Sequence, residues 1–84
     1  MDIVATRLEY QHWKDECPLR KARLAKGLSQ GLLGALCGVS GYTICKYENG
    51  ASNPEPRIAA KMALALGEPN LKKMLKAWRR SIPR

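Results

Sequence analysis

The stretch from Gln30 to Gly50 constrains the fold of this 84-residue chain more than any other part of it. Two short segments with helical periodicity, 30–37 and 41–48, are joined by only three residues, Gly38-Val39-Ser40. Helices with so short a connection must cross steeply, as they do in a helix-turn-helix unit. Gly38 can adopt the positive φ with which a chain leaves a helix, and Ser40 is a favourable N-cap for the next helix. A helix-turn-helix over residues 30–48 is therefore predicted.

The apolar pattern within this stretch supports a close crossing of the two helices. Gly34 has no side chain, so the backbone of the second helix can approach it. The residues expected to turn inward from both helices are Leu33, Cys37, Val39, Ile44 and Tyr47.

Further turn signals divide the rest of the chain into helical segments and predict an all-α fold, a compact bundle of about five helices. One helix is expected from Pro18 to about Lys26, one from Pro56 to just before Gly67, and one after Asn70. A chain of this length holds one hydrophobic core. Residues 1–17 are interpreted as an arm or short helix, 18–67 as the helix-turn-helix core, and 68–84 as a basic amphipathic helix.

The net charge of +8 is large for this length and is unevenly distributed. Residues 1–17 hold two basic and four acidic side chains, whereas residues 18–84 hold thirteen basic and three acidic ones. Because lysine and arginine release counterions when they neutralise phosphates, a basic body indicates a polyanionic partner. A solubilising surface explains the charge equally well, so charge alone does not decide.

Several classes of function have no support in the sequence. The three cysteines form no Cys-x-x-Cys pair and His12 lies at no ligand spacing from Cys17, so neither a metal nor another cofactor is expected. There is one histidine, no nucleophile–base set and no phosphate-binding glycine loop, which argues against an enzyme. No apolar run is long enough for a membrane span or a signal peptide, so a cytoplasmic protein without membrane contact is expected.

The sequence from Leu28 to Gly50 resembles the lambda-repressor-like helix-turn-helix family, which includes Cro, phage repressors and Xre-type regulators. The resemblance rests on the pattern Leu28-Ser29-Gln30-x-x-Leu33-Gly34-x-x-Cys37-Gly38-Val39-Ser40-x-x-Thr43-Ile44-x-Lys46-Tyr47-Glu48-Asn49-Gly50 and on the later Asn53-Pro54. It covers about residues 19–67. It implies a protein that binds operator DNA, usually as a two-fold dimer.

The resemblance also implies roles for individual residues. Gln30 would reach a phosphate and brace the second helix, and Asn49 with the backbone amides around Gly50 would clamp another phosphate. Glu48 would pair with Arg23 to hold that helix structurally. The base-facing positions of the second helix would be Gly41, Tyr42, Thr43 and Lys46, where Lys46 suits guanine and Thr43 a thymine methyl or a phosphate.

Three positions depart from the family pattern. Gly31 replaces a common acidic residue, Gly41 stands where many members carry a long polar side chain, and Cys45 replaces an outward polar residue. One base contact is therefore expected to be missing, although a glycine also lets the backbone approach DNA. An inert Cys45 is favoured over a redox-active one, because Lys46 would lower a thiol pKa only mildly.

An apolar stripe in the last segment has three interpretations: packing on the bundle, a two-fold interface, or contact with a membrane surface. The first two are favoured, because half-site spacing requires a dimer built from some exposed apolar face. The residues assigned to this interface are Leu71, Met74, Leu75 and Trp78.

The function expected from these features is that of a sequence-specific transcriptional regulator, a repressor of bacterial or phage type. It would insert the helix 41–48 into the major groove of a palindromic operator as a homodimer. One alternative is an antitoxin that binds a toxin through residues 1–15. The other is a protein-interaction module that kept the fold and lost DNA binding, an option that Gly41 keeps open.

Overall fold

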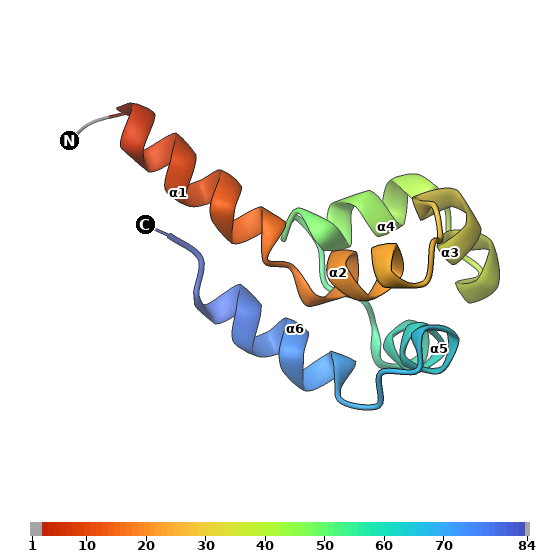
Figure 1. Cartoon of the computed structure of the whole chain (residues 1–84). Coiled ribbons are helices and arrows are strands. Elements are labelled where there is room, and N and C mark those ends of the chain that lie inside the picture. Colours follow the sequence, from red (N-terminus) through yellow and green to blue (C-terminus); the bar gives the residue numbers. More distant parts are fainter. Residues whose placement is uncertain (1–2, 84) are drawn as a thin grey trace.

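The computed structural model describes residues 3–83 and is all-helical in that range (Figure 1). Its six helices are α1 (Ile3–Asp15), α2 (Pro18–Ala25), α3 (Gln30–Cys37), α4 (Gly41–Glu48), α5 (Pro56–Leu66) and α6 (Leu71–Arg80). The all-α class is confirmed, with one helix more than the five expected because residues 3–15 form a full helix. Residues 1, 2 and 84, which the predicted segments included, lie outside the described residues.

The core lies between α2, α3, α4, α5 and α6. α3 packs against α4 and α5, and α6 packs against α2 and α5. Pro18 and Pro56 begin α2 and α5, where a proline costs no helical hydrogen bond. The largest fully buried side chains come from five helices and the segment before α2: Cys17, Leu19, Leu33, Cys37, Ile44, Met62 and Leu71.

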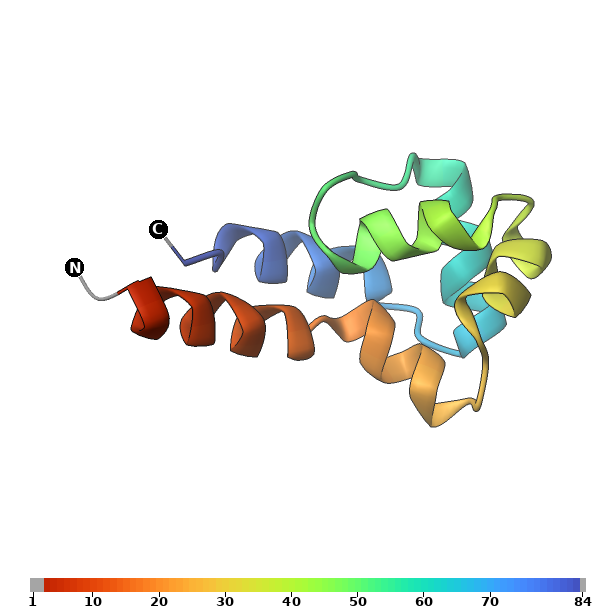
Figure 2. The same cartoon turned by 90° about the horizontal axis from the view of Figure 1, so that it is seen from above.

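The molecule is elongated, 42 × 22 × 20 Å, because α1 and α6 project together from the bundle. Figures 1 and 2 show the two helices at the end of the molecule opposite α3, running in opposite directions. Within residues 3–83, no helix is long and apolar enough to cross a membrane.

Two stacked tryptophans join α1 to α6. The ring centroids of Trp13 and Trp78 lie 4.1 Å apart and the ring planes differ by 5°. Each indole donates to the other residue's backbone: Trp13 Nε1 to the Trp78 carbonyl at 2.8 Å, and Trp78 Nε1 to the Trp13 carbonyl at 2.7 Å. Both buried N–H groups are thereby satisfied, so the contact fixes α1 in position as well as burying apolar area.

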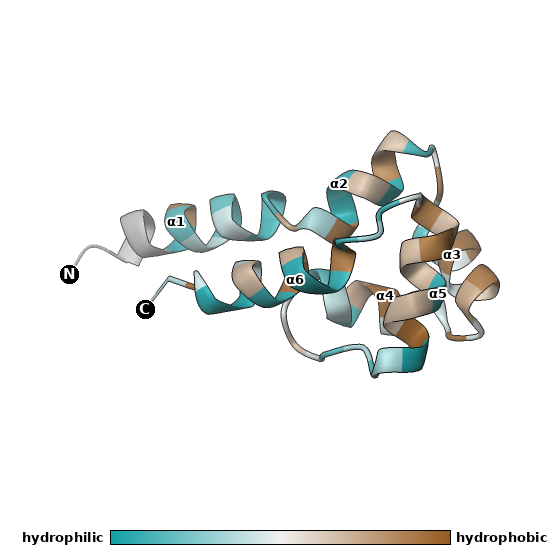
Figure 3. Cartoon of the chain, turned by 90° about the horizontal axis from the view of Figure 1, so that it is seen from below, coloured by the Kyte–Doolittle hydropathy of each residue, from teal (hydrophilic) through white to brown (hydrophobic). Residues whose placement is uncertain are grey.

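The apolar stripe of α6 faces the chain's own core. Leu71, Leu75 and Trp78 are buried, and Met74 is half-buried against the same cluster. Along α6, brown and pale segments therefore alternate with teal ones (Figure 3). α1, α2 and α5 pack against α6 and leave Leu71, Leu75 and Trp78 little exposed area, while the dimer interface predicted from this stripe stays a prediction.

Candidate nucleic-acid interface

Both helices of the helix-turn-helix begin at a serine cap. Ser29 Oγ accepts a hydrogen bond from the Leu32 amide at 3.0 Å, and Ser40 Oγ accepts one from the Thr43 amide at 3.0 Å. Gly38 ends α3 in the left-handed region with φ +77°, a conformation that favours glycine. These local signals fix where α4 begins and hence which of its side chains face outward.

α3 and α4 cross at bare backbone. A Cβ atom added at Gly34 would lie 2.5 Å from the Val39 carbonyl oxygen, too close for any side chain. A Cβ atom at Gly41 would lie 3.0 Å from Gly31 Cα. The departure from the family pattern at Gly41 is therefore a packing feature, because the α3 backbone at Gly31 lies where its side chain would be. Because the Cβ position of Gly41 points at α3, a contact with a base at this position, which stays a prediction, would have to come from the backbone.

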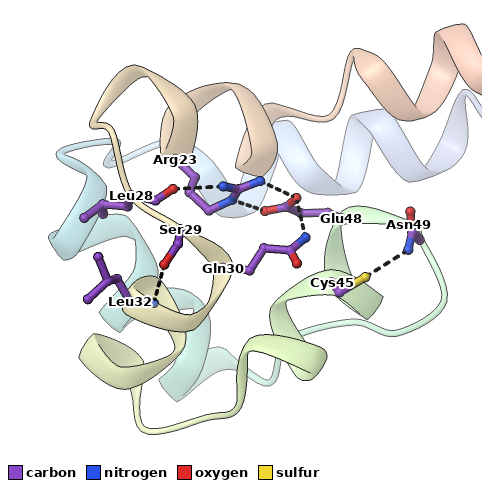
Figure 4. A network of polar contacts seen from close by, with 8 residues as sticks. All are labelled: Arg23, Leu28, Ser29, Gln30, Leu32, Cys45, Glu48 and Asn49. Atoms are coloured by element: carbon purple, nitrogen blue, oxygen red, sulfur yellow. Dashed lines mark hydrogen bonds and ion pairs between the residues drawn. The ribbon is translucent and has the colours of Figure 1, made fainter.

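A buried network fastens the end of α4 to α2 and α3 (Figure 4). Arg23 donates through Nε to Glu48 Oε2 at 2.6 Å and through Nη2 to Oε1 at 3.0 Å, and both side chains are buried. Arg23 Nη1 donates to the Leu28 carbonyl at 2.8 Å. The hydrogen bond with Glu48 raises the pKa of Arg23 above its ordinary value. The single acidic residue of the helix-turn-helix is thus neutralised and turned away from its outer surface.

Gln30 joins the same network. Its Nε2 donates to Glu48 Oε1 at 3.2 Å, and the side chain is half-buried at the first position of α3 (Figure 4). An amide nitrogen carries a second hydrogen and the amide oxygen accepts, so the group keeps hydrogen-bonding capacity for a further partner. The bracing role that the resemblance implied for Gln30 has a structural counterpart in this bond.

The outward face of α4 carries an aromatic ring and a cation one turn apart. Tyr42 is 73% exposed, and Lys46 Nζ lies 5.3 Å from the centre of its ring, within cation–π distance. Thr43 is half-buried, and its Oγ1 lies 2.9 Å from Ser40 Oγ. Such a face offers hydrogen-bond donors, positive charge and apolar area together.

Cys45 and Asn49 continue this face. Asn49 Nδ2 donates to Cys45 Sγ at 3.4 Å, and the Asn49 side chain is exposed (Figure 4). The backbone amides of Gly50 and Ala51 donate to the Tyr47 and Lys46 carbonyls. Because these two amides already close the end of α4, they are not available to a phosphate. Of the groups expected to clamp a phosphate here, the exposed Asn49 side chain remains a candidate.

The loop after α4 is held by residues that the sequence prediction did not connect to it. Arg79 Nη1 donates to the Gly50 carbonyl at 3.2 Å and to the Ser52 carbonyl at 3.0 Å. Trp13 packs on Gly50, where a Cβ atom would lie 2.6 Å from its ring. These partners lie 27 or more residues apart in the chain, so no local pattern could have indicated them. Gly50 adopts a positive φ, a conformation that favours glycine, so the glycine itself is the local sequence feature that marks this position.

Comparison with protein families gives one match. A family model described as helix-turn-helix (HTH_3, the Cro/C1 type) matches residues 19–69, more than half of the chain. The chain belongs to this lambda-repressor-like family. Its members are DNA-binding regulatory domains and are typically not enzymes. No curated protein and no solved structure matches the chain.

Proposed function

We propose that this DNA-binding helix-turn-helix protein is a sequence-specific transcriptional repressor that places α4 in the major groove of operator DNA. The observation that carries the proposal is the outward face of α4. Exposed Tyr42 and half-buried Lys46 lie together there, while Glu48 is held inside by Arg23. A lysine can donate to guanine O6 and N7, and a groove-facing aromatic can contact base edges or backbone.

Phosphate contacts in this proposal come from the residues around α4. Gln30 at the start of α3 and Asn49 at the end of α4 flank the helix, and Thr43 lies near its start. Contacts of this kind position a protein on DNA without specifying sequence. The buried network below α4 supports recognition because it holds the helix rigidly against the rest of the bundle.

Recognition of a palindromic operator requires two copies of the chain. A homodimer remains part of the proposal, and Leu71, Leu75 and Trp78 offer its interface little exposed area. Sedimentation of the free protein and of its complex with duplex DNA measures the stoichiometry. Two chains per palindromic duplex are expected, and one chain per duplex would contradict the dimer.

Selection of bound sequences from a random duplex pool tests the function itself. A palindromic motif is expected, and absence of enrichment would overturn sequence-specific binding. On the selected site, Lys46→Ala should weaken binding by about 1–3 kcal/mol if Lys46 contacts a base. Lys73→Ala is the matched control, because Lys73 is an exposed lysine of α6 and its removal takes away the same charge at a position outside α4. Equal losses of duplex affinity in both variants would mean that Lys46 contributes only general charge attraction.

The salt dependence of binding provides an independent check. Each phosphate contact should contribute roughly −0.9 to the slope of log affinity against log salt concentration. A steep slope supports a phosphate-binding surface, whereas a flat one favours the protein-interaction module. Gly41 no longer favours that module, because its contact with Gly31 gives the glycine a packing role.

The projecting α1 keeps the antitoxin as a second candidate function. On this helix Leu8 is 66% exposed and Tyr10 is 38% exposed, an arrangement that a partner protein could cover. Binding of DNA through α4 would be unaffected by that role. Loss of a co-purified partner on Leu8→Ser substitution, with unchanged duplex affinity, would support it.

A further inference from the structure

A cleft with a volume of about 570 Å³ lies between α6 and the segment that leads from α4 into α5. Four cationic side chains of α6 line it: Lys72, Lys76, Arg79 and Arg80. The eight described residues that line the cleft include no acidic side chain and none from α3 or α4. The cleft is thus separate from the surface assigned to DNA recognition.

The cleft also has apolar lining. Pro54 before α5, Ala59 of α5 and Leu75 of α6 supply it, and the last two are buried. Its volume falls within the range of sites that enclose small molecules, roughly 300–1,000 Å³. A phosphate backbone would contact only the cations of the cleft. A molecule with both an anionic and an apolar part would contact the cations and the apolar lining together.

One of the cations is held in place before any ligand arrives. Arg79 is half-buried, and its Nη1 is fixed by the Gly50 and Ser52 carbonyls at 3.2 and 3.0 Å. Both bonds come from one nitrogen, so the remaining N–H donors of the guanidinium stay available to an anion. A donor that is already positioned loses less conformational entropy when it binds.

We propose that this cleft is a binding site for a small organic polyanion, a molecule that carries phosphate or several carboxylate groups on an apolar or ring-shaped body. The cations of α6 would bind the charged groups, and Pro54, Ala59 and Leu75 would receive the body. This site goes beyond the proposed DNA function and does not depend on it.

Calorimetric titration of the full chain with ATP, in the absence of DNA and added metal, tests the proposal. Tripolyphosphate is the matched probe without an apolar body. ATP should bind about tenfold more tightly than tripolyphosphate if the apolar lining is used. Equal affinities for the two probes would overturn a site for organic molecules.

Two double variants of equal charge separate the cleft from the general attraction of a +8 protein. Lys72→Gln/Lys76→Gln removes two cleft cations, and Lys26→Gln/Lys73→Gln removes two exposed lysines that do not line the cleft. The first pair should weaken ATP binding about tenfold or more, and the second pair far less. Equal effects would contradict a built site.

Duplex binding by the same variants distinguishes failure of this proposal from failure of the DNA function. The cleft pair should affect duplex affinity no more than the control pair does. If the cleft pair weakens duplex binding selectively and leaves ATP binding unchanged, the cations belong to the DNA surface and the proposal is overturned. Sequence-specific DNA binding by α4 would stand in that case.

Discussion

Two opposite charges meet in the interior where α2 crosses the end of α4. Arg23 and Glu48 are both buried and bonded through two N–H···O contacts, with Gln30 and the Leu28 carbonyl completing the set. Removing one member of such a pair leaves the other charge buried without a counterion, which costs more than the pair itself contributes.

Arg23→Ala should therefore lower the free energy of unfolding by about 3–5 kcal/mol. Glu48→Gln should cost less, because the amide keeps an acceptor for Arg23 in the same place. Lys21→Ala is the control within α2, since Lys21 pairs with Glu16 on the exposed surface and should matter little. Urea denaturation measures all three. If Arg23→Ala and Lys21→Ala had the same free energy of unfolding, the buried pair would not be a stabilising feature.

The three cysteines should differ sharply in reactivity. Burial raises the pKa of the Cys17 and Cys37 thiols, whereas Cys45 is partly exposed on α4. Because the thiolate is the nucleophile, a colorimetric thiol reagent at neutral pH should modify one cysteine quickly and two only on unfolding. Cys45→Ala should abolish the fast phase, and a fast phase that persists in this variant would contradict the assignment.

The same two shifts have a consequence for stability. An acid whose pKa is raised by folding stays protonated in the native state while it ionises in the unfolded chain. Cys17 and Cys37 thus stabilise the fold fully below the pKa of an unfolded thiol, about 8.5, and their contribution declines as the pH rises above it.

At the scale of elements, the crossing of α3 over α4 depends on the absence of side chains. Gly34→Ala would push a methyl group to within 2.5 Å of the Val39 carbonyl, and backbone cannot yield as a flexible side chain can. The variant should lose about 1–3 kcal/mol of stability through overpacking, despite the higher helix propensity of alanine.

Gly31→Ala in the same helix is the matched control. A Cβ atom there meets only Ser29 Oγ at 3.9 Å, so this variant should be as stable as the original chain or slightly more stable. Thermal unfolding of both variants compares them. Equal melting temperatures would mean that the two helices can separate at Gly34 without cost.

How far the sequence predicts these elements depends on the range of the interactions that form them. Gly38, Ser29 and Ser40 act on the nearest turn, so the limits of α3 and α4 could be predicted to the residue. The contact between Gly31 and Gly41 could not be predicted. A glycine in a sequence shows that a side chain is absent, but it does not show which part of the backbone packs there.

The candidate site divides in the same way. The pattern placed Tyr42 and Lys46 together on a helix face, since one helical turn separates them. The apolar stripe of α6 was consistent with either a core or an interface, because periodicity shows that a face is buried but not by which chain. Part of the core that covers this stripe is Trp13, which lies 65 residues from Trp78 in the sequence and so could not be linked to it by periodicity.

For the whole molecule, the attachment of α1 decides the shape. α1 leaves the bundle and is joined to α6 through the stacked indoles of Trp13 and Trp78. Trp13 also covers Gly50 at the end of α4, so the projecting helix reaches the base of the DNA-binding unit.

Trp13→Ala should destabilise the protein by about 3–5 kcal/mol, because it leaves a cavity and removes one of the two reciprocal hydrogen bonds. Tyr10→Ala removes a ring nearly one turn earlier in α1 and, because Tyr10 is exposed, should have a much smaller effect. Hydrogen exchange in Trp13→Ala should show α1 amides losing protection while α3 and α4 keep theirs. Unchanged protection of α1 would show that the indole contact does not hold it.

The stacked indoles also make the molecule its own optical reporter. The chain contains two tryptophans, and both lie in this one contact. Intrinsic fluorescence excited selectively at indole therefore reads the docking of α1 on α6 without any label. A change in emission when duplex DNA is added would reveal movement of a helix that carries none of the residues proposed to contact DNA.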